Sequence, residues 1–256
     1  MAEILGTPDV WPRLALLLLI TLAASLARGF SGFGAALIFV PLASALLGPR
    51  VAAPLLLITD SLMSLPMIPR ALPLANRREA ATMAIGAIVG VPAGTWLLAT
   101  SDPHSIRWGI AALAGSMLVL LASGWRYRGQ PKPPLTVLVG FVSGTCSGAA
   151  QIGGPPVVAY WLGGVNRAPA VRANIVVFFA LTSLLSIAGY LWGGLFSLQI
   201  LTLAALIAPV YGAGLWAGSH MFGLASERTF RRICLAMIAL ATVVSLPVLD
   251  GWLRGG

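Results

Sequence analysis

Charged side chains are scarce in this sequence, and acidic ones are scarcer still. Only 9% of its 256 residues are charged, and seven acids stand against sixteen lysines and arginines. A soluble domain carries about 25% charged residues to cover its surface. Apolar residues make up 58% of the chain, and the mean hydropathy is +0.92. These values exclude a water-soluble globule, and the sequence predicts a polytopic membrane protein instead.

Motifs for catalysis and metal binding are lacking too. Cys146 and Cys234 are far apart, and no CxxC pair or His/Cys cluster occurs. There is no Walker A motif, which argues against ATP hydrolysis. A membrane enzyme, the rival class, needs a nucleophile with a base, paired carboxylates or metal ligands. The sequence therefore predicts no enzyme, no cofactor and no metal site.

Ten apolar stretches follow one another along the chain. A helix needs roughly 20 residues to cross the hydrocarbon core. Six stretches have that length, at about 51–69, 80–100, 105–125, 172–192, 198–219 and 230–249. Four are shorter and form two consecutive pairs, 13–28 with 34–48 and 135–149 with 154–164. Glycine and small polar residues interrupt each pair, at 29–34 and at 144–148. Because irregular backbone at membrane depth needs surrounding protein or a watery cavity, two broken or re-entrant hairpins are predicted.

The order of these stretches occurs twice, which indicates an internal repeat. At a constant offset of 115, Pro41 corresponds to Pro156 and Gly48 to Gly163. We predict an all-α membrane protein of two inverted-topology repeats, each with a hairpin followed by three transmembrane helices. The predicted divisions are an N-terminal repeat at 1–125, a cytoplasmic linker at 126–133 and a C-terminal repeat at 134–256. Trp96 and Trp216 lie at equivalent positions, and we expect both to pack in the core.

The basic residues predict the orientation. A net charge of +9 would suggest a nucleic-acid partner for a soluble protein, but these residues lie in short gaps between apolar stretches. Four gaps hold eleven of them: Arg70, Arg77, Arg78; Arg126, Arg128, Lys132; Arg167, Arg172; Arg228, Arg231, Arg232. All four gaps share one side if each hairpin returns to the side where it began. The positive-inside rule then makes this side cytoplasmic and both termini periplasmic, with no nucleic-acid partner.

Two glycine motifs carry a family resemblance. The stretches from Gly32 to Pro41 and from Gly144 to Pro156 resemble the two repeat motifs of the TauE/SafE family, and the second has Gln151-Ile152-Gly153-Gly154-Pro155-Pro156 at its core. The resemblance covers nearly the whole chain. It implies a bacterial inner-membrane carrier of sulfite, sulfonates such as sulfoacetate, or related organosulfur anions, mostly an exporter.

An anion site needs N–H donors, hydroxyl groups and a cation, and helix N-termini supply such donors. The candidate substrate-binding residues are Arg28, Ser31, Gly32, Phe33, Gly34, Ser143, Thr145, Cys146, Ser147, Gln151, Gly153, Gly154, Arg172 and Asn174. Arg28 is either the countercharge for the anion or an interfacial residue, and Arg172 is either a ligand or a cytoplasmic anchor. Asp60 has three possible roles: pairing with Arg28, carrying a coupling proton or cation, or bonding neighbouring hydroxyls. The glycines could instead serve only close helix packing, which is favoured for Gly90 and Gly94.

Taken together, the sequence predicts a secondary transporter that works by alternating access around a midplane site between the hairpins. The alternatives are an anion channel and a carrier of another small anion such as a carboxylate. The predicted partners are a small anionic substrate, the lipid bilayer and a coupling proton or cation, and a homodimer would suit a chain of this size.

Overall fold

The computed structural model describes residues 10–31, 34–162, 168–220 and 227–249, and within them every regular element is a helix. The helices are α2 (Val10–Ser31), α3 (Ala35–Leu47), α4 (Pro49–Ser64), η1 (Leu65–Met67), α5 (Ile68–Ala71), α6 (Arg77–Thr100), α7 (Pro103–Ser123), α8 (Pro133–Ala150), α9 (Gly154–Trp161), α10 (Ala168–Trp192), α11 (Leu198–His220), α12 (Glu227–Val244) and η2 (Pro247–Leu249). Seven stretches among them are long and apolar enough to cross a membrane, so the chain is a multi-pass membrane protein.

The predicted spans are mostly confirmed, with three exceptions. Five of the six long stretches are spans, but the sixth contains only a shorter apolar helix, Arg232–Val244. Conversely, the stretches expected to be short at 13–28 and 135–149 form the full-length spans Trp11–Phe30 and Pro133–Ala150. α8 gains its length because prolines suit the first turn of a helix and because its glycines stay helical against a neighbouring helix.

The breaks in the two hairpins therefore lie later than predicted. Helix α2 continues through Gly29 to Ser31, and α8 continues through Gly144 and Gly148 to Ala150. The second break falls at Gln151–Gly153 instead of 144–148. Glycine in a helix costs only about 0.5–1 kcal/mol relative to alanine, which packing can offset.

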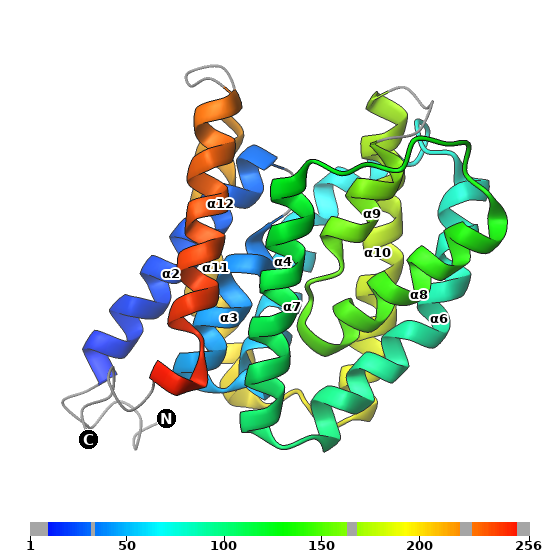
Figure 1. The fold of residues 1–256 in the computed structure, drawn as a ribbon. Coiled ribbons are helices and arrows are strands. Elements are labelled where there is room, and N and C mark those ends of the chain that lie inside the picture. The colour runs from blue at the N-terminus through cyan, green and yellow to red at the C-terminus, as the bar shows by residue number, and fades with distance from the viewer. Residues whose placement is uncertain (1–9, 32–33, 163–167, 221–226, 250–256) are drawn as a thin grey trace.

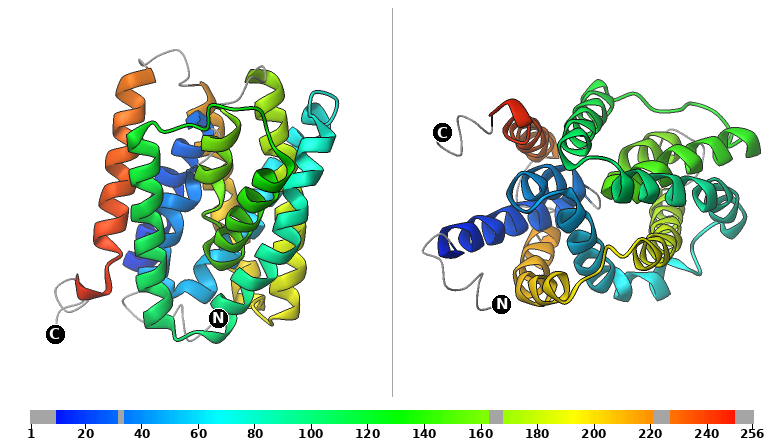
Figure 2. Two further views of the ribbon diagram at one scale, coloured as in Figure 1. Left: turned by 45° about the vertical axis from the view of Figure 1, so that its right-hand side comes forward. Right: turned by 90° about the horizontal axis from the view of Figure 1, so that it is seen from below.

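The helices form a bundle in which each hairpin turns back inside the protein (Figures 1 and 2). Helix α2 begins and α3 ends at the lower end of the bundle in Figure 1, whereas α8 begins and α9 ends at the upper end. The turn after α5, the segment between α7 and α8, and the starts of α10 and α12 also lie at the upper end. The hairpins thus open toward opposite ends, while the duplication itself stays a prediction.

Glycines bring two pairs of helices into backbone contact. On α6, Gly86, Gly90 and Gly94 face Gly140, Gly144 and Gly148 of α8, and a Cβ atom on any of the six would meet atoms of the facing helix, in most cases its backbone. This arrangement confirms packing for Gly90 and Gly94 and extends it to Gly144 and Gly148 of the second motif. We call this contact the α6–α8 seam.

A second seam joins α2 to α11. A Cβ atom on Gly29 would meet the backbone of Leu215, and one on Gly218 would meet the backbone of Leu26. In each predicted repeat of five apolar stretches, the first stretch corresponds to α2 or α8 and the fourth to α6 or α11. Each seam therefore pairs the first stretch of one repeat with the fourth stretch of the other. Such reciprocal pairing is what a duplicated fold would produce.

The two tryptophans expected in the core lie on the surface instead. Trp96 is 64% exposed and Trp216 is 66% exposed. Trp96 follows Gly94 of the α6–α8 seam by two residues, and Trp216 follows by two residues Gly214, where a Cβ atom would meet the Ser25 side chain of α2. Two residues rotate about 200° around a helix, so each tryptophan points away from the neighbour that its glycine contacts. The prediction of core packing was wrong because it did not consider which face the glycines occupy.

Candidate functional site

A central cavity lies between the two hairpins at mid-depth. Its lining comes from α2, α3, α4, α8, α9 and α10 and from the turns that open α3 and α9. Asp60, which lines it, is the twelfth residue of the 23-residue span Pro49–Ala71. The cavity volume is about 60 Å³, a few times the roughly 10–15 Å³ that one water needs on the same measure. The space therefore suits a few waters or one small ion.

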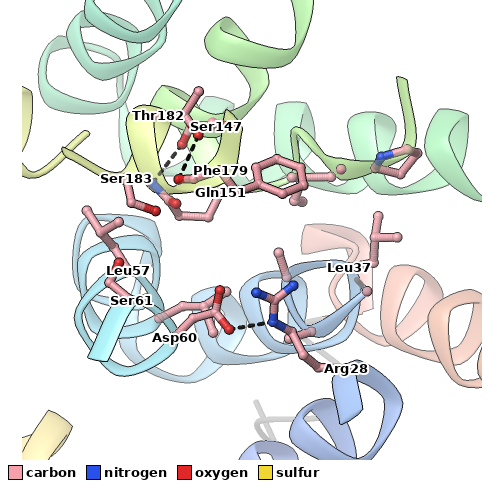
Figure 3. Close-up of a pocket in the computed structure, with 17 residues that line it drawn as sticks. Arg28, Leu37, Leu57, Asp60, Ser61, Ser147, Gln151, Phe179, Thr182 and Ser183 are labelled. Atoms are coloured by element: carbon pink, nitrogen blue, oxygen red, sulfur yellow. Dashed lines mark hydrogen bonds and ion pairs between the residues drawn. The ribbon is translucent and has the colours of Figure 1, made fainter. Parts of the chain in front are cut away.

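One wall of the cavity carries a partly buried ion pair (Figure 3). Arg28 Nε lies 2.6 Å from Asp60 Oδ1, and Arg28 Nη2 donates to Ser64 Oγ at 3.1 Å. The Tyr211 hydroxyl on α11 donates to the same Asp60 oxygen at 2.6 Å, and the Tyr211 side chain is fully buried. Of the roles open for Asp60, pairing with Arg28 is the one that the geometry displays. Arg28 lines the cavity instead of extending to an interface.

The opposite wall is polar without being charged. Ser147 and Gln151 of the second hairpin lie beside Thr182 and Ser183 of α10, facing the ion pair across the cavity (Figure 3). On α4, Ser61 also lines the cavity, and its hydroxyl has no hydrogen-bond partner among the described residues. Hydroxyl groups can donate to an anion, so these side chains are suitable ligands for one.

Gln151 adopts a strained backbone conformation where α8 ends. Its φ of 59° lies in the left-handed region, and no other residue except glycine has a positive φ in the described part of the chain. Its Nε2 donates to Ser147 O at 2.8 Å and to Tyr190 Oη at 3.2 Å, while the Tyr190 hydroxyl donates to Gly148 O at 2.8 Å. Such strain costs about 1–3 kcal/mol and persists only where the surroundings enforce it. The network thereby fixes the amide at the cavity wall.

The turn after Gln151 is held by small residues. Ser143 Oγ donates to Gly153 O at 2.7 Å, and a Cβ atom on Gly153 would meet Ser147 Oγ. Neither Ser143 nor Gly153 lines the cavity. These two predicted ligands therefore shape the turn, and Gly154 beside them reaches the cavity.

The two helix N-termini at the cavity differ in their N–H donors. Gly34, with φ 107°, precedes α3, and the first residues of that helix, Ala35 and Ala36, line the cavity with their amides free of intrahelical partners. In α9, Gly154 is followed by two prolines, which have no N–H. The first hairpin therefore offers more backbone donors than the second, although the sequence predicted both equally.

Several predicted ligands lie away from the cavity. The Thr145 hydroxyl donates to Phe141 O, and Cys146 packs against the main core cluster. Asn174 Oδ1 accepts from the backbone N–H of Asn76 at 2.7 Å and so supports the start of α6. Arg172 lies near the start of α10, at the upper end of the bundle. Ser31 ends α2, its side chain lies outside the described residues, and so do Gly32 and Phe33.

The sequence missed the residues that complete the site: Ser61, Ser64, Phe179, Thr182, Ser183 and Tyr211. A tyrosine within an apolar span was a usable signal, because a buried hydroxyl needs a partner. The serines and threonines gave no signal, because such residues commonly bond a carbonyl of their own helix.

The comparison with protein families supplies the identity. The family model described as sulfite exporter TauE/SafE matches residues 17–245. The chain belongs to this family. TauE/SafE proteins are membrane transporters of the sulfite-exporter type, and the matched region contains the second hairpin, most of the first and the whole lining of the central cavity. Comparisons with curated proteins and with solved structures gave no match.

Proposed function

We propose that this TauE/SafE protein is a secondary transporter that exports a small organosulfur anion across the bacterial inner membrane. The observation that carries the proposal is Arg28, a cation in a small cavity at mid-depth, facing hydroxyl and amide groups. A charged residue inside the membrane is expensive and marks a functional site by default. Sulfite and sulfonates such as sulfoacetate offer several oxygens that accept hydrogen bonds from these donors.

Binding of the anion competes with Asp60. The Asp60 carboxylate already neutralises Arg28, and these two are the only charged residues among those described as lining the cavity. An anion that takes Arg28 therefore leaves the carboxylate without its countercharge and beside a like charge. The Tyr211 hydroxyl, the other titratable group at this carboxylate, stays a hydrogen-bond donor to it. Asp60 is thus the proposed carrier of a coupling proton, and Arg28 the proposed anion ligand.

The basic residues supply the proposed orientation. Arg70 on α5 and Lys132 before α8 belong to the end of the bundle at which α10 and α12 begin. The positive-inside rule assigns this end of the bundle to the cytoplasm. The opposite end, where α2 begins and α12 ends, is then assigned to the periplasm. Alternating access then opens the cavity toward either end in turn.

A binding assay tests the anion ligand. Purified protein is heated with sulfite, thiosulfate, sulfate, taurine, sulfoacetate and a carboxylate control. A ligand at a hundredfold excess over its Kd stabilises the folded state by about 2.7 kcal/mol. We expect a shift with an organosulfur anion in the wild type and in Arg126→Gln, an exposed-arginine control, and none in Arg28→Gln. A rise in Tm with the carboxylate alone would contradict the proposed substrate class. A rise in Tm that is the same in Arg28→Gln as in the wild type would contradict the assignment of Arg28 as the anion ligand.

The pH dependence of binding tests Asp60. If one proton accompanies each sulfonate, the Kd rises by up to about tenfold for each unit by which the pH is raised. Asp60→Asn should bind with little pH dependence. Counterflow in liposomes separates the carrier from a channel, because only a carrier exchanges labelled for unlabelled anion through a saturable site.

A further inference from the structure

A second cavity lies at the end of the bundle where α10 begins. It is formed by η1, α5 and the following turn on one side and by the N-terminal part of α10, as far as Val176, on the other. Its volume is about 380 Å³, and it shares no lining residue with the central cavity. Pro66 and Pro69 shape it, because the helical rod that starts with α4 is broken there into α4, η1 and α5.

The lining combines apolar surface with two arginines. Met67, Leu74 and Val176 represent its apolar part, and Met67 and Leu74 are largely exposed. Arg70 and Arg172 contribute positive charge from two different helices, and the described lining contains no acidic residue. The second cavity therefore offers a hydrophobic wall and a cationic group side by side.

The depth of the arginines matches the interface of a bilayer. Arg70 is the penultimate residue of the span Pro49–Ala71, and Arg172 is the fourth residue of Pro169–Trp192. Residues at the ends of spans lie at the level of lipid headgroups. Basic pockets between transmembrane helices at this level suit anionic headgroups.

We propose that the second cavity binds an anionic phospholipid, with its phosphate at Arg70 and Arg172 and an acyl chain along Met67, Leu74 and Val176. A free inorganic anion would gain nothing from the apolar wall, and a zwitterionic lipid would place a second cation beside the two arginines. Such a lipid bridges α5 and α10. Because α5 continues the rod that carries Asp60 and α10 carries Thr182, it braces two walls of the central cavity.

The test compares lipids on the full-length protein in detergent. Native mass spectrometry and thermal unfolding are measured with phosphatidylglycerol, with phosphatidylcholine of the same chains and with glycerol phosphate, which lacks acyl chains. We expect bound phosphatidylglycerol and a rise in Tm, with at least tenfold weaker binding of the other two. Equal binding of phosphatidylcholine would reduce the site to ordinary lipid contact, and equal binding of glycerol phosphate would make it a site for free anions. Either result overturns the proposal.

Two matched double variants locate the site. Arg70→Gln with Arg172→Gln should weaken phosphatidylglycerol binding at least tenfold, whereas Arg126→Gln with Arg128→Gln, exposed at the segment before α8, should leave it unchanged. The single variants Arg70→Gln and Arg172→Gln are measured as well, so that the result does not depend on the folding of one protein. Equal losses in both double variants would show a general charge effect and overturn the proposal.

Discussion

The ion pair between Arg28 and Asp60 allows a double-mutant cycle whose outcome can be worked out in advance. Removing one partner of a buried pair costs about 3–5 kcal/mol because the other charge is left uncompensated. Here the two side chains keep 16% and 28% of their exposure, so the lower end applies, about 3 kcal/mol for Arg28→Met or Asp60→Leu alone. Each kcal/mol corresponds to about 2–4 °C in a chain of this size, so each single variant should lose about 6–12 °C in Tm.

The double variant Arg28→Met with Asp60→Leu should be no less stable than either single variant. It removes both charges and replaces them with apolar side chains, which is often neutral or stabilising. Additive losses would instead sum to about 6 kcal/mol, so the expected coupling energy is at least about 3 kcal/mol. Thermal unfolding of the four proteins at one heating rate measures it. Additivity within about 0.5 kcal/mol would refute the idea that the two charges stabilise each other.

Three further substitutions follow from the structure. Gly140→Ala places a Cβ atom against the α6 backbone and should lower the free energy of unfolding by about 1–3 kcal/mol, measured by thermal unfolding. The control Gly109→Ala, at a position with open space for a Cβ atom, should cause no such loss. Tyr211→Phe removes the hydrogen bond to the Asp60 carboxylate and should cost about 1.5–3 kcal/mol; no loss of Tm would contradict that bond's importance. Gln151→Gly relieves the positive φ and removes the amide from the cavity wall, so we expect near-native Tm with at least tenfold weaker binding of the stabilising anion. An unchanged affinity would remove Gln151 from the ligand set.

The helical spans were largely predictable, because length and apolarity decide them. The positions of the breaks were not, because a glycine either interrupts a helix or packs it closely against another, and the sequence does not distinguish the two. Gly144 and Gly148 remain helical because α6 supplies the contact. The chain breaks only at Gln151–Gly153, just before Pro155 and Pro156, because these prolines lack the N–H groups that a continued α8 would need and are tolerated in the first turn of α9.

Some residues of the candidate site could be predicted from the sequence, and others could not. Arg28 and Asp60 stood out because charges within apolar stretches are rare, and their pairing was among the roles considered. Tyr211 lies 151 residues from Asp60 in sequence, so only the packing of α11 could bring the two together. Arg172 and Asn174 lie away from the central cavity, because polar residues at the start of a span serve caps and interfaces as readily as ligands.

The two glycine seams constrain how the cavity can open. Helices in backbone contact cannot slide or tilt without losing that contact, so α6 with α8 and α2 with α11 each behave as one rigid body. Each body takes one helix from either half of the chain, and neither half can therefore swing as a unit against the other. Among the described residues, the turn between α8 and α9 is where we expect a hinge. In the proposed transport cycle, we therefore expect the short helices α3 and α9 to move while the helices of the two seams stay fixed.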